Sequence, residues 1–142
     1  LLQSGVNVAK HLVPKGPIVS MTDKSGATET FSSELEKVPF PIAVLVNHGT
    51  ASAAEIVSGA IQDTGSGKLF GTKTFGKGVV QNVFMLSQKT AVKLTIAKYY
   101  TPSGRSIDKV GIEPDETVEA IGAAGTNQLE AAEAYLKTVI SQ

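Results

Sequence analysis

Cysteine is absent from this 142-residue sequence, which excludes thiol catalysis, disulfide bonds and thiolate metal sites together. Net charge is absent too. The 13 Lys and Arg residues balance 13 Asp and Glu residues and are spread along the chain, so no basic patch predicts nucleic-acid binding. No apolar run approaches the roughly 20 residues that a membrane-spanning helix requires. The sequence has no cluster of possible metal ligands, and we expect neither a metal nor another cofactor.

Hydrophobic residues make up 42% of the chain and charged residues 18%, which is enough apolar material for a packed core. The length fits a single domain. The chain begins at Leu1 without an initiator Met or a signal peptide, and we interpret this start as a cut within a longer sequence.

The order of apolar patterns predicts a mixed α/β fold. We expect a helix within residues 1–13, strands at 18–22 and 28–32, a loop at 34–41, a strand at 42–46 buried on both faces, and a helix that begins near residue 53 and ends at Gly65. Strands should follow at about 79–86 and 91–100, the second with one wet face, and then a helix at 128–140 after a linker at 122–125. This order predicts one core over residues 1–120 and a linker with a terminal helix over residues 121–142.

Residues 47–55 join the predicted buried strand to the predicted helix, a place where a side chain is exposed beside unpaired helix N–H groups. From this turn Ser52 could attack a carbonyl while the N–H of Ala53 helps to hold the developing oxyanion. A purely structural interpretation also fits, since Ser52 followed by Glu55 matches a capping box, in which serine satisfies helix donors. Thr50 could cap the helix equally well and leave Ser52 free. The turn alone leaves both interpretations open.

Residues 71–78, GTKTFGKG, come close to a phosphate-binding loop, in which two glycines separated by four residues precede Lys and then Ser or Thr. Gly78 replaces the hydroxyl that would bind Mg²⁺, and residues 79–84 are strand-like, so the helix N-terminus that cradles phosphate is missing. We therefore expect no nucleotide site. What remains is Lys77 between Gly76 and Gly78, where the backbone can approach closely and desolvate it. A solvated turn lysine is the structural alternative.

A histidine is the other possible base for Ser52. His48 lies in the same turn and His11 on the first predicted helix, and either could complete a Ser-His-Asp triad. The candidate aspartates are Asp23, Asp63 and Asp108. No spacing favours one of these combinations.

Four segments in register resemble the carboxyl-terminal processing peptidases, also called tail-specific proteases. They are residues 46–55 around Ser52, residues 71–81 around Lys77, residues 99–107 (YYTPSGRSI) and residues 111–115 (GIEPD). The resemblance extends from about residue 1 to residue 118. It implies a ClpP/crotonase-like α/β fold, with a mixed sheet and helices packed on it plus a C-terminal helix. It also implies a serine endopeptidase that cuts protein or peptide substrates near free C-termini through an acyl-enzyme.

Carried over position by position, the resemblance implies that Ser52 is the nucleophile, that Lys77 is the general base and that Gln81 orients Lys77. The N–H of Ala53 would be one oxyanion donor, and His48 lies where the family varies and receives no role. Leu1 and Leu2 resemble the residues after the family's Gly-Gly turn, which supplies the other donor. Because that turn is not in this sequence, we expect the 142-residue chain to be nearly inactive alone.

The resemblance also implies partners and a compartment. The family carries a PDZ domain that captures substrate C-termini, and none is visible in these 142 residues. A homodimer would form through strand edges or the C-terminal helix, and the location would be extracytoplasmic.

The residues agree with this chemistry. A serine hydroxyl needs a base beside it, and an ordinary lysine, with a pKa of about 10.4, is protonated at pH 7. Burial without a carboxylate partner lowers the pKa of a lysine. The chain has no acid between residues 68 and 101, and neutral Gln81 is the polar partner offered to Lys77.

Two other functions remain as alternatives. A non-catalytic binding or scaffold domain of the same fold would not need Ser52, Lys77 and Gln81 together. An acyl-CoA enzyme of the crotonase-like fold would use oxyanion N–H groups without a Ser-Lys pair, and Glu55 is the one carboxylate at the helix start that could serve it.

Overall fold

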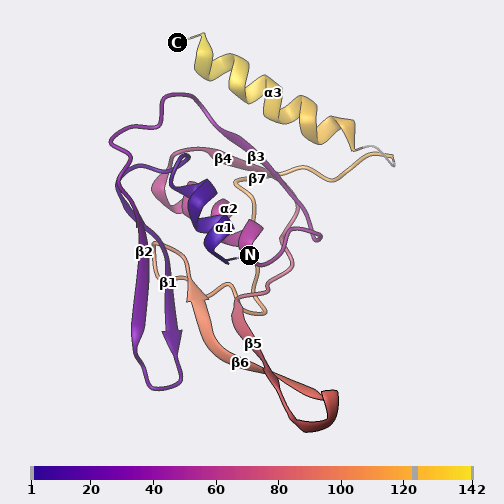
Figure 1. The fold of residues 1–142 in the computed structure, drawn as a ribbon. Helices are drawn as coiled ribbons and strands as arrows, with labels where there is room; N and C mark the ends of the chain where they lie inside the picture. The colour runs from indigo at the N-terminus through magenta and orange to yellow at the C-terminus, as the bar shows by residue number, and fades with distance from the viewer. Residues whose placement is uncertain (1, 123–124, 142) are drawn as a thin grey trace.

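The computed structural model describes residues 2–122 and 125–141 and has two sheets (Figure 1). The larger sheet is antiparallel, in the order β2-β1-β6-β5, and its strands are β1 (Gly16–Asp23), β2 (Thr28–Ser33), β5 (Val79–Met85) and β6 (Ala91–Tyr100). The smaller sheet is parallel, in the order β3-β4-β7, and consists of β3 (Ala43–Val46), β4 (Lys68–Gly71) and β7 (Glu116–Thr117). A short 3₁₀ turn, η1 (Ser87–Lys89), joins β5 to β6. The predicted mixed α/β class is confirmed.

Helix α2 (Ala53–Thr64) contacts β1 of the larger sheet and β4 of the smaller one, so it connects the two sheets. Helix α1 (Leu2–Ala9) packs against α2, and α3 (Thr126–Ile140) contacts β3 and β4 from the other side of the smaller sheet (Figure 1). The core that these elements share consists of Val6, Ala9, Val13, Ile18, Val19, Ile42, Val46, Ile56, Ala60, Ile61, Leu69, Tyr99, Ile107 and Ile112.

Helix α2 forms where the sequence predicts it, because Ile56, Ala60 and Ile61 share one face and are all buried. It ends at Gly65, which adopts the left-handed conformation (φ 66°) that favours glycine. Residue 46 of β3 and residue 71 of β4 lie so close that a Cβ on Gly71 would come within 2.0 Å of the Val46 carbonyl oxygen. The strands before the two candidate loops are therefore in direct contact.

Several boundaries differ from the sequence prediction. The first helix ends at Ala9, and the strand over residues 68–71 was not predicted because its apolar run is too short to show a period. The prediction that the strand at 42–46 is buried on both faces is wrong, because within β3 Leu45 is exposed and only Val46 is buried. The terminal helix begins two residues early, at Thr126, and residues 123–124 of the predicted linker lie outside the described residues.

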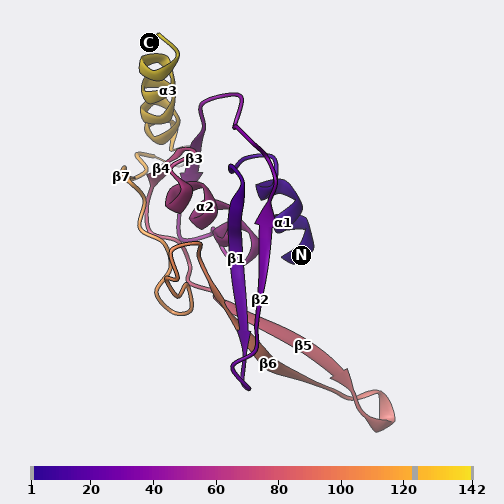
Figure 2. The ribbon, with the colours of Figure 1, turned by 90° about the vertical axis from the view of Figure 1, so that its left-hand side faces the viewer.

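The β5–β6 hairpin projects away from the body of the chain (Figure 2). The alternation in β6 is present, but its apolar side chains Leu94 and Ile96 are exposed instead of covered. Exposed apolar side chains also occupy the other strand and the turn, at Val83, Phe84, Met85 and Leu86. Period-two patterning thus predicted the strand correctly and did not determine what lies against its apolar face.

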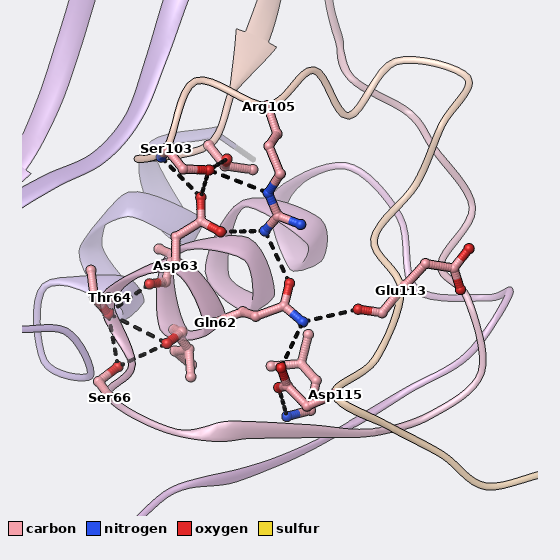
Figure 3. A network of polar contacts seen from close by, with 12 residues as sticks. Gln62, Asp63, Thr64, Ser66, Ser103, Arg105, Glu113 and Asp115 are labelled. Carbon is pink, nitrogen blue, oxygen red and sulfur yellow. Dashed lines mark hydrogen bonds and ion pairs between the residues drawn. The ribbon is translucent and has the colours of Figure 1, made fainter.

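The carboxyl end of α2 is held by a polar network (Figure 3). Arg105 donates to the side-chain oxygens of Gln62, at 3.0 Å, and Asp63, and Gln62 donates in turn to Asp115 at 3.1 Å. Burial alone would raise the pKa of Asp63, but hydrogen bonds from Ser103 and the charge of Arg105 hold it below its ordinary value. The network fastens the segments 101–107 and 113–115 to α2.

Candidate active site

Ser52 lies directly before α2 with a positive φ of 58° and a ψ of −118°. A side-chain-bearing residue rarely adopts this conformation, which costs about 1–3 kcal/mol and is often retained at functional sites. Ser52 and Glu55 have the arrangement of a capping box, in which the Ser52 side chain faces the Glu55 N–H and the Ser52 N–H donates to the Glu55 carboxylate at 2.9 Å. The Ser52 hydroxyl makes no capping hydrogen bond, so it is available for another role.

The strain at Ser52 gives a stability prediction. Glycine adopts positive φ without steric cost, whereas alanine retains the strain and removes only the hydroxyl. Glycine also raises the entropy of the unfolded chain, which offsets part of this advantage. We expect the free energy of unfolding of Ser52→Gly to exceed that of Ser52→Ala by about 1 kcal/mol. Urea denaturation of both variants measures the difference. If the alanine variant proves equally or more stable, the turn is not strained.

The oxyanion donor proposed from the sequence is also free in the described residues. The N–H of Ala53 has no backbone acceptor there, while the next N–H groups, of Ala54 and Glu55, donate to the carbonyl oxygens of Ala51 and Ser52 at 3.2 and 2.9 Å. An unpaired N–H at the start of a helix points outward and attracts negative charge.

The loop that carries Lys77 is packed against residues 107–112. The N–H of Lys109 donates to the Gly76 carbonyl oxygen at 2.8 Å, and a Cβ on Gly78 would come within 2.2 Å of the Asp108 nitrogen. The close backbone approach expected at these glycines is confirmed. The accompanying expectation that Lys77 itself is desolvated is wrong for the described residues, because its side chain is exposed.

Glu55 joins the two loops. Its side chain is fully buried. One carboxylate oxygen accepts the backbone N–H groups of Ser52 and Lys77, both at 2.9 Å. The other accepts the Gly76 N–H at 2.7 Å and the Thr74 hydroxyl at 2.6 Å. Since four donors point at one group, the carboxylate sets the position of the serine turn relative to the lysine loop.

A pocket of about 350 Å³ brings the sequence candidates together. Ser52, Lys77 and Gln81 all line it, and they come from the turn before α2, the loop after β4 and strand β5. The remaining lining residues are Leu2, Val79, Val80, Lys93 and Tyr99. Burial raises the pKa of Tyr99, so its phenol is neutral at ordinary pH.

The histidine alternative is not assembled in the described residues. His48 packs against Phe75 with the rings tilted by 45° and their centroids 5.4 Å apart, and no described histidine lines the pocket of Ser52. Asp63 lies at the opposite end of α2, about 18 Å along a helix of 12 residues. Asp108 pairs with Lys98, and Asp23 accepts hydrogen bonds within its own turn.

The acyl-CoA alternative is also disfavoured. It required the Glu55 carboxylate as an acid or base, but both oxygens are engaged by buried donors, and Glu55 is not among the residues that line the pocket.

Sequence reasoning assigned no site role to four other pocket residues: Val79, Val80, Lys93 and Tyr99. It also missed the role of Glu55 beyond its capping box. The sequence shows the alternation of apolar and polar residues around residue 93. It does not determine which face of β6 lies toward Ser52, because that depends on how β6 pairs with β5 and β1.

A hydroxyl in a strained turn at a helix start, in one pocket with a lysine, is compatible with the nucleophile and base of a serine-type hydrolase. The model of peptidase family S41 matches residues 1–118, and the chain belongs to this family. It is 46% identical over 120 residues to a carboxyl-terminal-processing protease of Synechocystis sp. and 43% identical over 117 residues to a chloroplastic C-terminal processing peptidase of Tetradesmus obliquus. Among solved structures it resembles a photosystem II D1 C-terminal processing protease, at 41% identity and a TM-score of 0.77.

These matches involve most of the chain but a minor part of each relative. They cover 84%, 81% and 84% of this chain, and 28%, 25% and 31% of the Synechocystis, Tetradesmus and solved proteins. Within residues 2–122 and 125–141, no helix is long and apolar enough to cross a membrane. The comparisons therefore establish the family of carboxyl-terminal processing serine peptidases for this catalytic region.

Proposed function

We propose that the protein containing this chain is a serine endopeptidase that cuts protein substrates near their C-termini through a Ser-Lys dyad. The observation that carries the proposal is that Ser52, in a strained turn with its hydroxyl uncommitted, lines one pocket with Lys77 and Gln81. Membership of family S41 supports it.

In this proposal Ser52 Oγ attacks the substrate carbonyl as Lys77 Nζ accepts its proton. The N–H of Ala53 stabilises the oxyanion, and the protonated Lys77 gives its proton to the leaving amine. Water then hydrolyses the acyl-enzyme, with Lys77 again accepting a proton. Gln81, a neutral neighbour on the same pocket wall, keeps the amine in position without the carboxylate that would favour its charged form.

A serine-directed reagent tests the proposal. We expect a fluorophosphonate to label the full-length protein at Ser52, as located by peptide mass mapping, because the dyad raises the nucleophilicity of that hydroxyl. Ser52→Ala should lose the label. Ser58→Ala is the matched control, since this buried serine of α2 donates to the Ala54 carbonyl oxygen at 2.8 Å and should not react. A folded wild-type protein that takes no label would favour the scaffold alternative.

The proposal extends to partners and location. Substrates are proteins or peptides with free C-termini, and a homodimer would form through strand edges or α3, where Leu129 and Ile140 are exposed. An extracytoplasmic compartment follows from the family resemblance, while the relative from Tetradesmus is named as chloroplastic. The division into a core over residues 1–120 and a tail over residues 121–142 remains part of the same proposal.

A further inference from the structure

The pocket of Ser52 carries positive charge without a balancing acid. Lys77 and Lys93 line it, and none of the other lining residues is acidic. The nearby Glu55 carboxylate accepts hydrogen bonds from four donors of the two loops and forms no ion pair with either lysine among the described residues. A lysine assigned as base is neutral when it works, which leaves Lys93 as the fixed cation of the pocket.

Lys93 has no ion-pair partner among the described residues, unlike Lys98 on the same strand. Lys98 of β6 forms an ion pair with Asp108 at 3.7 Å, whereas the ammonium of Lys93 has no ion pair or hydrogen bond among the described residues. Its side chain is exposed and lines the pocket. An unpaired cation in a substrate pocket provides a contact for an anion of the ligand.

The edge of β5 indicates what shape that ligand has. Within the described residues β5 is an outer strand, so one of its sides has no strand partner. The Gly78 carbonyl oxygen faces β6, where it accepts the Tyr99 N–H at 2.8 Å, so the groups of Val79 and Gln81 face the open side. These residues line the pocket, and a free edge of this kind pairs with an extended peptide.

The open edge is short and ends beside Lys93. By the same alternation the Val83 N–H also faces the open side of β5. It donates a hydrogen bond to the side-chain oxygen of Asn82 at 2.9 Å, so it is not available to a peptide. Val83 is the residue of β5 that stands opposite Lys93. A peptide that pairs with β5 from Val79 to Gln81 therefore leaves the edge near Lys93, in the same pocket as Ser52.

We propose that Lys93 is a specificity-determining residue that pairs with a carboxylate of an extended peptide substrate lying along β5, near the bond that Ser52 attacks. This rests on the proposed function. The carboxylate is either the free C-terminus of the peptide or an acidic side chain, and both present the same chemistry to the ammonium.

Peptide binding and cleavage by the full-length protein test the proposal. Fluorescent peptides are made with a C-terminal acid or amide and, in a second series, with Glu or Gln at each position near the cleaved bond. Binding is measured by anisotropy on a Ser52→Ala background, where no peptide is cut. We expect one carboxylate to improve Kd about three- to tenfold over its neutral counterpart. The series in which it does so identifies its source.

Replacing Lys93 should remove that preference selectively. Lys93→Met keeps the length of the side chain without its charge, and we expect it to weaken only the carboxylate peptide, while the neutral peptide is unaffected. With active Ser52, measured at a pH where the rate has levelled off, the ratio of KM for the neutral peptide to KM for the carboxylate peptide should fall toward one. Lys93→Arg should restore the preference, Lys93→Glu should reverse it, and Lys98→Met is the matched control on the same strand.

Two results would overturn the proposal. One is a carboxylate preference that survives in Lys93→Met, because it then belongs to another site. The other is an equal loss of binding for acidic and neutral peptides. A different result would refute the proposed peptidase function: the wild-type protein would bind these peptides but cleave none of them.

Discussion

Lys77→Arg is expected to lower kcat/KM of the full-length protein as far as Lys77→Ala, by roughly a thousandfold or more. Guanidinium remains charged at any usable pH, so it cannot accept the Ser52 proton. Lysine can, once it has lost its own proton. The wild-type rate should therefore rise with pH and then level off, whereas the residual rate of the arginine variant should not follow this profile.

Lys73 provides the control for this experiment. It lies in the same loop and is also exposed, but it pairs with Glu113 at 2.7 Å and does not line the pocket. Lys73→Arg should change the rate less than about twofold. If Lys77→Arg keeps more than about a tenth of the wild-type activity, a loss under roughly 1.4 kcal/mol, Lys77 is not the base.

Glu55→Gln is expected to reduce stability and activity together. The amide keeps one oxygen but turns an NH₂ toward two of the donors that now point at the carboxylate. Two buried donors without acceptors should lower the free energy of unfolding by about 2–5 kcal/mol. Displacement of the Ser52 turn relative to the Lys77 loop should lower kcat about a hundredfold.

Urea denaturation and peptide kinetics on the same preparation of full-length protein measure both effects. Glu34→Gln serves as the control, because among the described residues this exposed glutamate pairs with Lys15 at the surface, and its replacement should change stability by less than about 1 kcal/mol. Unchanged stability in Glu55→Gln would mean that the carboxylate does not hold the two loops. Normal stability with a large loss of rate would assign it a direct chemical role instead.

The candidate site could be predicted in part because its key residues sit in local patterns. Ser52 follows a buried strand and starts an amphipathic helix, and Lys77 lies between two glycines, so their surroundings follow from a few neighbouring residues. The four motifs in register then tied the sequence to a family, and the match to peptidase family S41 confirms that assignment. Sequence alone therefore determined the fold class and the family.

The remainder depends on contacts between distant residues. Glu55 meets Thr74 and Lys77 across about twenty positions, Lys93 reaches the pocket only through the register of β6 with β5, and that register shifts at one point near Val80. Local periodicity fixes which residues share a face, but not which faces meet. Hence the sequence by itself specified the helices, most strands and the residues proposed for chemistry. The tertiary structure alone decided what holds the two loops together, which cation shares the pocket, and that Lys77 is exposed.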